Sequence, residues 1–374
     1  MHRLMAGVTI LEHELSELRL LVERQTGIML DCPNSALAAH VADYLESQEL
    51  ESAASLLCRL RALDQDPFAL PAFLDGVLNV NTGFFRHPGA MNALARQVIP
   101  QIYARKSDDG FCTLRIWSAG CGTGEEAYSI AMALCEAIPG GNASPTVNGN
   151  GKGEGKEKNA VRNGGITDAG LAASALPSMK DWSIHIVGTD LLSSSIAVAE
   201  RGLYPQSALA GLPPTAIRAC FSKIGSASGS DGNGSQEGPQ NIGRSASAIG
   251  FANGANGRHA TNGTNATNGS GSGAHLLVKP RLRSLVTFNT MNLTKPVYIG
   301  RFDCIFCMDV LPHLSRVQRT ALLERLHLYL EPGGYLFLSQ TEKLCAPNLN
   351  FRSETFDGYT FHRKPLAASA AYGR

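Results

Sequence analysis

A glycine-rich segment near the middle of the chain has the residue types and spacing of a nucleotide-binding loop. An apolar run ends at Ala119, and Gly120, Gly122 and Gly124 follow before helix-forming residues begin at Glu125. Glycine adopts positive φ without a steric penalty and lets bare backbone approach a ligand, while the N-terminus of the next helix offers unpaired N–H groups. The same spacing serves NAD, FAD and S-adenosylmethionine, and it also occurs in glycine turns with a structural role. The surrounding sequence must therefore identify the ligand.

Three features downstream of the loop narrow the choice. The apolar run 182–189 ends at Asp190, the position from which a second parallel strand presents a carboxylate to ribose hydroxyls. Residues 301–310 have the composition of a buried strand, and a helical stretch at 315–330 leads into a Pro-Gly-Gly turn and an apolar run. That turn is similar to class I S-adenosylmethionine-dependent methyltransferases and unlike NAD domains. These features predict an α/β, Rossmann-like methyltransferase with S-adenosylmethionine as its cofactor.

A second motif lies upstream, where the stretch 79–88 contains Thr82, Phe84, Phe85 and Arg86 in the order Thr-x-Phe-Phe-Arg. Together with the segments Trp-Ser-Ala at 117–119 and Thr-Gly-Glu-Glu-x-Tyr-Ser at 123–129, it closely resembles the CheR-type family, the glutamate methyltransferases of chemotaxis receptors. The resemblance covers most of the chain in the family's order. It implies a protein-glutamate O-methyltransferase built from a small helical domain, a class I methyltransferase domain and a small antiparallel β-subdomain.

The elements that must position these motifs follow the same order. Residues 1–75 show helical periodicity, with Leu11, Leu15, Leu18 and Val22 on one face of the first helix and further helices expected near 35–45 and 52–63. From residue 67 to residue 81 the chain is expected to cross to the catalytic domain. We therefore expect a helical N-terminal domain and, at 76–110, a linker and start of the catalytic domain that carries the Thr-x-Phe-Phe-Arg motif.

The methyltransferase domain is expected at 111–374, with two inserted segments. The stretches 140–180 and 225–273 are dominated by small and polar residues, a composition that does not offset ordering entropy, so both are expected to be disordered insertions. The resemblance places the β-subdomain at about 216–288, with the second insertion as an expanded hairpin loop. In some family members this subdomain docks a receptor peptide, and a purely structural hairpin is the alternative here.

Composition excludes several classes of protein. The 374 residues are 44% hydrophobic, without a charged-then-apolar leader or an apolar run near the ~18 residues that span a bilayer, so we expect a cytoplasmic protein without membrane insertion. Residues 1–75 hold five Arg and Lys against twelve Asp and Glu, which gives no support to nucleic-acid binding. Cys304 and Cys307 point to opposite faces of the predicted strand, so no metal site is expected.

The resemblance also implies roles for individual residues. Thr82 and Arg86 lie against the methionyl end of the cofactor, with Arg86 paired to a carboxylate of the cofactor or of the substrate. Glu126 contacts the cofactor, whereas Glu125 caps the helix end. Asn292 and Leu293 take the adenine, with a simple turn role as the alternative for Asn292. The expected cofactor-binding set is Thr82, Arg86, Gly120, Gly122, Gly124, Glu126, Asp190, Asn292, Leu293, Met308 and Asp309.

The acceptor side departs from the family pattern. The family usually has Arg-Asn-Val and then, after two intervening residues, a tyrosine. This chain has Met308 and Asp309 before Val310, and His313 in the tyrosine position. His313 is expected either to act on the acceptor, together with Arg86 as a catalytic residue, or merely to line the pocket. The acidic helical domain should repel an acidic receptor helix, which favours a partner with a basic or neutral docking face.

The leading function is methylation of a glutamate in a chemoreceptor-like or other signalling protein. Two alternatives remain. The first is a methyltransferase for a small molecule or a different protein. The second is a non-catalytic module that binds S-adenosylmethionine in signalling. A carboxylate acceptor is ionised near neutral pH, so the leading function requires no strong base, in agreement with the lack of a Ser-His-Asp or paired-carboxylate signature.

Overall fold

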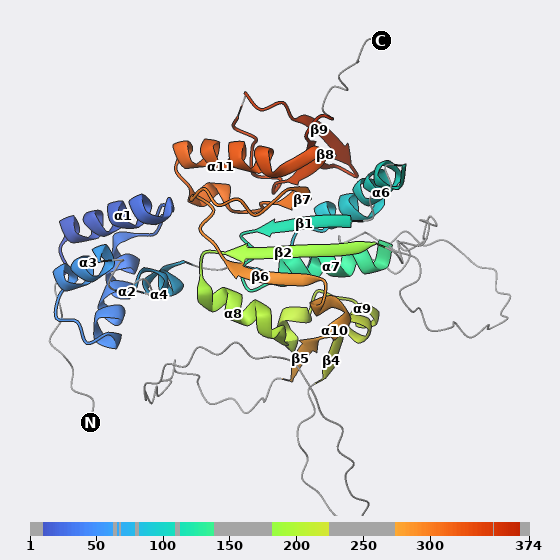
Figure 1. Cartoon of the computed structure of the whole chain (residues 1–374). Coiled ribbons are helices and arrows are strands. Elements are labelled where there is room, and N and C mark those ends of the chain that lie inside the picture. The colour runs from blue at the N-terminus through green and yellow to red at the C-terminus, as the bar shows by residue number, and fades with distance from the viewer. Residues whose placement is uncertain are drawn as a thin grey trace, which may run out of the picture.

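A computed structural model describes residues 10–62, 66, 69–78, 82–108, 113–137, 182–223, 274–346 and 348–366. The expected insertions at 140–180 and 225–273 lie outside the described residues. Figure 1 shows a group of helices at one end of a twisted sheet, and the arrowheads of strands β1 and β2 point toward this group. Within the described residues, no helix is long and apolar enough to cross a membrane.

Four helices near the N-terminus share a hydrophobic core of their own. They are α1 (Glu12–Thr26), α2 (Asn34–Ser47), α3 (Ala53–Arg61) and α4 (Ala69–Val77). Leu15, Leu18 and Val22 of α1 are buried in this core as the periodicity predicts. Leu11, which was expected on the same face, precedes the first helical residue and is 49% exposed.

Helix α4 was not expected, because residues 67–81 were predicted to be a connection. Ala69–Val77 instead folds as a helix whose Phe73 and Leu74 are buried with the other three helices. The close approach of α4 to α2 depends on Gly76, since a Cβ there would lie 2.1 Å from the ring of His40. The expected boundary at residue 75 therefore falls within this helix.

The catalytic part of the chain is built on a sheet of seven strands. Its order is β6-β2-β1-β7-β8-β10-β9, with β1 (Thr113–Ala119), β2 (Ser183–Asp190), β6 (Val286–Thr290), β7 (Phe302–Phe306), β8 (Leu330–Phe337), β9 (Arg352–Phe356) and β10 (Tyr359–Arg363). The first five strands are parallel, and β10 is antiparallel to both of its neighbours. The strand order reverses at β1, and ligands of such sheets bind at the carboxyl ends beside that point. The α/β class and the Rossmann-like arrangement are thereby confirmed.

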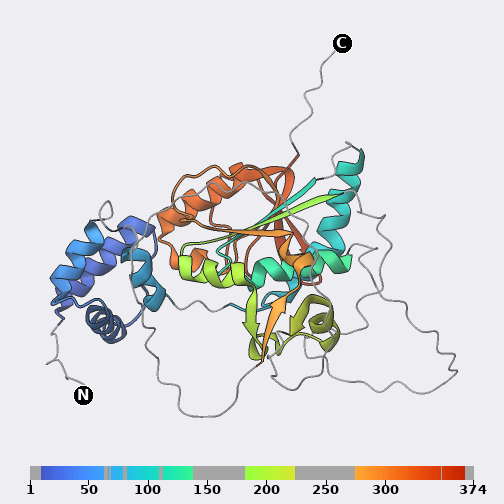
Figure 2. The same ribbon diagram turned by 60° about the horizontal axis from the view of Figure 1, so that its bottom comes forward.

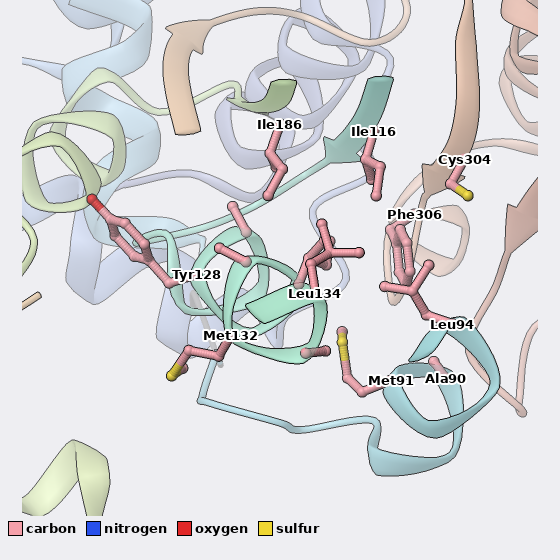
Figure 3. Packing of buried hydrophobic residues seen from close by; sticks show 14 of the residues in the cluster. Ala90, Met91, Leu94, Ile116, Tyr128, Met132, Leu134, Ile186, Cys304 and Phe306 are labelled. Atoms are coloured by element: carbon pink, nitrogen blue, oxygen red, sulfur yellow. The ribbon is translucent and has the colours of Figure 1, made fainter. Parts of the chain in front are cut away.

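Helices cover both faces of this sheet. They are α5 (Pro88–Ala93), a π-helical turn at Leu94–Val98, α6 (Ile99–Asp108), α7 (Glu125–Ala137), α8 (Ser193–Arg201) and α11 (Arg316–Tyr329). Figure 3 shows Tyr128 and Leu134 of α7 packed beneath Ile116 and Ile186 of the sheet. The opposite face packs against α11. Cys304 belongs to the first of these clusters and Cys307 to the second, so the two thiols lie on opposite faces.

A second, smaller sheet lies below α7 and α8 in Figure 2. It is antiparallel with the order β3-β5-β4, from β3 (Leu203–Pro205), β4 (Phe221–Lys223) and β5 (His275–Val278), accompanied by a 3₁₀ turn (Gln206–Leu209), α9 (Pro214–Cys220) and α10 (Pro280–Arg283). The expected antiparallel sheet is present, with different limits. It begins before residue 216, and the segment 286–290 pairs with β2 in the large sheet.

Candidate active site

The predicted site residues meet in one cavity at the carboxyl ends of the parallel strands. This cavity, named here the main cleft, has a volume of about 340 Å³. The sequence-predicted residues that line it are Thr82, Arg86, Gly120, Gly122, Glu126, Asp190, Asn292, Leu293, Met308, Asp309 and His313. Gly124 is the one member of the predicted set that does not line it.

The glycine turn after β1 presents its backbone to the main cleft. Gly120 and Gly122 have φ of +89° and +53°, values that glycine adopts without the cost that a Cβ brings. A Cβ on Gly120 would lie 2.5 Å from the side chain of Val310. Gly124 has φ of +97° and packs against Ala199 of α8 instead, where a Cβ would come within 2.7 Å. Its role is to bring the turn close to that helix.

Asp190 ends β2 and fixes the glycine turn in place. One carboxylate oxygen accepts the N–H of Gly122 at 2.9 Å, and the other accepts the N–H of Leu192 at 2.9 Å. Burial raises the pKa of Asp190, and the backbone hydrogen bonds partly oppose that shift. The carboxylate thus lies at the strand end from which parallel sheets hold ribose hydroxyls.

Two adjacent glutamates at the start of α7 have different environments. Glu126 faces the main cleft, accepts the hydroxyl of Ser118 at 2.6 Å, and has its pKa raised to about 7 by burial. Glu125 is buried and does not line the cleft. Its carboxylate accepts the hydroxyls of Thr123 at 2.7 Å and Thr82 at 3.3 Å. Glu126 is therefore the one poised to meet a positively charged ligand, and Glu125 ties the linker to the helix end.

The Phe-Phe-Arg motif is attached to α7 through its backbone. Phe85, at φ of +51°, donates its N–H to the hydroxyl of Ser129 at 2.9 Å, and that hydroxyl donates to the carbonyl of Glu125 at 2.6 Å. Phe84 packs edge-on against Tyr204 and Phe221 of the small sheet. The motif therefore joins α7, the small sheet and the main cleft.

Arg86 and His87 converge on Asp309 at the end of β7. Arg86 Nε lies 3.2 Å, and His87 Nε2 2.8 Å, from the same carboxylate oxygen of Asp309. Asp309 has φ of +59°, and its N–H donates to Glu342 at 3.1 Å. Sequence reasoning identified Arg86 and Asp309 separately and missed both His87 and Glu342. The position of His87 directly after Arg86 was the signal available for it.

The far side of the main cleft contains the expected adenine residues. Asn292 Oδ1 accepts the N–H of Thr294 at 2.9 Å and its hydroxyl at 2.8 Å, the pattern of an Asx turn. Asn292 thus has the turn role that was its alternative, and it lines the cleft as well. Leu293 is beside it, and Met308 contributes a buried apolar side chain to the wall.

The helical domain closes one wall of the main cleft, which sequence reasoning did not foresee. Thr26 and Ile28, at the end of α1 and just after it, and Leu78, which follows α4, line it. The hydroxyl of Thr294 donates to the carbonyl of Thr26 at 2.9 Å. The N–H of Met29 donates to the carbonyl of His313 at 2.8 Å, beside a β-bridge between Ile28 and Leu314. His313 is exposed at this rim.

Comparison with known proteins finds similarity to methyltransferases. The family model described as CheR methyltransferase, SAM binding domain, matches residues 80–148 and 263–359. Chemotaxis protein methyltransferase 1 of Pseudomonas aeruginosa is 26% identical over 90% of this chain and 96% of its own length. Chemotaxis protein methyltransferase Cher2 of Pseudomonas putida is 25% identical over 91% of this chain and 98% of its own. The methyltransferase CalS10 of Micromonospora echinaspora shares 12% identity over 78% of this chain and 73% of its own, with a TM-score of 0.26.

A reversed parallel sheet, a glycine turn after β1 and a carboxylate after β2 are the features of a nucleotide-binding α/β fold. The family model identifies this fold as an S-adenosylmethionine-dependent methyltransferase. The family model and the two relatives go further. The chain is similar to the CheR methyltransferase family over the matched residues.

Proposed function

We propose that this enzyme transfers a methyl group from S-adenosylmethionine to the side-chain carboxylate of a glutamate in a chemoreceptor-like or other signalling protein, in the cytoplasm. The observation that supports it is the meeting of the Phe-Phe-Arg motif, the glycine turn and Asp190 in one cleft. The two relatives are named as chemotaxis methyltransferases and are matched over nearly their whole length. When bound, the cofactor supplies a methyl group on a sulfonium centre.

The residues of the main cleft fit a cationic cofactor. Glu126 is half-buried with its pKa raised to about 7, so a cation beside it would favour the ionised carboxylate. Asp190 offers a carboxylate already held by two backbone N–H groups. Gly120 and Gly122 present bare backbone. We assign Glu126 to the positive end of the cofactor, Asp190 to its ribose, and Asn292 and Leu293 to the base.

A carboxylate nucleophile needs positioning more than proton removal. The glutamate side chain is ionised near neutral pH, so the enzyme contributes by alignment and by exclusion of water. Arg86 is held by Asp309 and lines the cleft, where it can pair with a carboxylate. We assign it to orientation of the acceptor. His313, exposed at the rim, is the second acceptor-side candidate.

The cofactor assignment is tested by a glycine pair. Gly120→Ala places a methyl group 2.5 Å from Val310 at φ of +89°, whereas Gly211→Ala meets nothing within 4 Å. We expect calorimetry to show a loss of cofactor affinity of at least tenfold, about 1.4 kcal/mol, for the first variant alone. Equal affinities in the two folded variants would contradict the assignment.

The acceptor assignment is tested with methyl-labelled S-adenosylmethionine and a purified chemoreceptor cytoplasmic domain. We expect label in the protein that base converts to volatile methanol, the behaviour of a carboxyl methyl ester. Label recovered in small molecules would replace this function with that of a small-molecule methyltransferase. Cofactor binding without turnover on any acceptor would show a non-catalytic binding module.

A further inference from the structure

A second cavity of about 320 Å³ adjoins the main cleft. We name it the outer hollow. Arg86, His87 and Asp309 border both spaces and stand between them. The remaining walls of the outer hollow come from the start of α5, from the turn after β8 and from β10, namely Pro88, Gly89, Ser339, Gln340, Thr341 and Tyr359. The two spaces therefore meet at Asp309 and the two side chains paired with it.

The two spaces differ in charge. Among the described residues, the main cleft has the carboxylates of Glu126, Asp190 and Asp309 against the single guanidinium of Arg86. The outer hollow has one carboxylate within the same part of the chain, Asp309, which is paired with Arg86 at 3.2 Å, and its other polar groups are neutral or imidazole. The carboxylates of the main cleft suit a sulfonium cofactor and would repel an acceptor carboxylate that entered along them, so the outer hollow is the more favourable route to the cofactor.

The neutral side chains of the outer hollow are suited to a glutamate side chain. Gln340 and Thr341 are exposed, and Gln340 offers an amide donor. The hydroxyl of Thr341 lies 3.1 Å from that of Ser339, so the two hydroxyls form a pair on the wall. Tyr359 is buried, and its hydroxyl donates to the carbonyl of Leu338 at 2.6 Å, so its ring forms an apolar wall for a methylene chain. A Cβ on Gly89 would lie 3.0 Å from Tyr359, which shows how closely α5 packs on β10 there.

His87 is fixed at the border of both spaces. Its Nε2 lies 2.8 Å from a carboxylate oxygen of Asp309. It precedes Pro88, the first residue of α5, and Pro88 restricts the backbone at that position. His87 therefore lies nearer the acceptor path in this geometry than His313, which lines only the main cleft.

We propose that the outer hollow is the acceptor subsite, through which the glutamate side chain of a protein substrate passes Arg86 and His87 to reach the methyl group in the main cleft. This inference rests on the proposed function and adds the path and the residues that select the acceptor. Gln340 and Thr341 are specificity residues at the entrance, and His87 is a positioning residue that holds Asp309.

The test is a charge change at the entrance. Gln340→Glu adds one negative charge at an exposed turn position with almost no change of shape, and Gln340→Lys adds a positive one. With a purified chemoreceptor cytoplasmic domain as acceptor, we expect Gln340→Glu to raise the acceptor KM at least fivefold, Gln340→Lys not to raise it, and the Kd for S-adenosylmethionine to stay within twofold in both. The KM difference should shrink as salt rises.

Gln318→Glu is the matched control, since it makes the same chemical change in the first turn of α11, where a glutamate is favourable. Its acceptor KM should equal that of the wild type. Equal KM values for the Gln340→Glu and Gln340→Lys variants, or an equal rise with Gln318→Glu, would overturn the acceptor subsite while leaving the activity in place. A wild-type enzyme that binds the cofactor and forms no base-labile ester would instead overturn the proposed function, and this inference with it.

Discussion

The imidazole Nε2 of His87 lies 2.8 Å from a carboxylate oxygen of Asp309, although 222 positions separate the two residues in the chain. Arg86 contacts the same oxygen at 3.2 Å. One carboxylate thus organises both basic side chains that follow the Phe-Phe motif. The family usually has asparagine at the position of Asp309. The carboxylate that holds Arg86 and His87 is therefore one of the differences from the family pattern on the acceptor side.

Removal of the charge of Asp309 should move two binding constants in opposite directions. Asp309→Asn keeps a residue that tolerates φ of +59°, so the fold should be retained. The border between the two spaces then becomes more positive, and because the side chain of Asp309 is 37% exposed, solvent screening keeps the effect modest. We expect about threefold to tenfold weaker cofactor binding, ~1 kcal/mol, with a lower acceptor KM. Calorimetry measures the Kd of the cofactor, and methanol release measures the KM of the acceptor. A rise in both constants would contradict the charge argument.

Glu126 should make cofactor binding depend on pH. Its pKa is raised to about 7 in the free protein, and a cationic ligand favours the ionised form. Affinity should therefore fall below pH 7, by up to about tenfold per pH unit, and level off above it. Glu126→Gln should abolish this dependence between roughly pH 5.5 and 8, because one titrating proton is removed. An unchanged pH profile in this variant would assign the titration to another group.

The same shift has a consequence for stability. A carboxyl whose pKa is higher in the folded than in the unfolded protein is protonated in the fold while the unfolded chain is already ionised. The contribution of Glu126 to stability should therefore be largest below its unfolded pKa, near 4.5, and should be lost as pH rises through about 7. Denaturant titrations of the cofactor-free protein should show this decline, and Glu126→Gln should remove it.

The wall made by the helical domain is tested by two glycines with the same backbone conformation. Gly27 has φ of +78° and Gly358 has φ of +77°. A Cβ on Gly27 would lie 2.4 Å from Thr294, whereas one on Gly358 would meet nothing within 4 Å. Both alanine variants should lose about 1–2 kcal/mol of stability through the left-handed backbone. Only Gly27→Ala should also weaken cofactor binding, and equal binding in both variants would show that the contact is unimportant for the cleft.

The acidic helical domain should make turnover depend on ionic strength. Residues 1–75 carry a net charge of −7 from five Arg and Lys against twelve Asp and Glu. Methylation of an acidic receptor helix should become faster between low salt and physiological salt, where the Debye length falls to about 8 Å, because repulsion is screened. A basic or neutral partner should show no such gain. Efficient esterification of the acidic receptor at low salt would contradict the predicted preference for a basic or neutral partner.

The spacing of residue types along the sequence predicted the structural features that depend on residues close together in the chain. Leu15, Leu18 and Val22 follow helical spacing and are buried together, and the glycine turn lies at the sheet position that its spacing indicates. Helix α4 was not predicted, because Pro71 and Gly76 disfavour a helix locally. Packing of Phe73 in the core of the helical domain stabilises it instead.

Contacts between segments far apart in the sequence could not be predicted from the spacing of residue types. The approach of His87 to Asp309, and that of Ile28 to Leu314, arises only when the sheet and the helical domain come together. Leu11 was predicted to share a helix face with Leu15, Leu18 and Val22. The helix begins one residue later and leaves the side chain of Leu11 at its exposed end.

The bridge between Ile28 and Leu314 makes the helical domain part of the main cleft. Through Thr26 and Ile28 the helical domain supplies part of the wall of the main cleft, and the bridge fixes that wall to the catalytic part of the chain. We therefore expect a displacement of these helices to change how easily the cofactor enters and leaves the main cleft. A protein bound to the helical domain would therefore act on the exchange of the cofactor, whereas the outer hollow, which is lined by residues outside that domain, receives the glutamate.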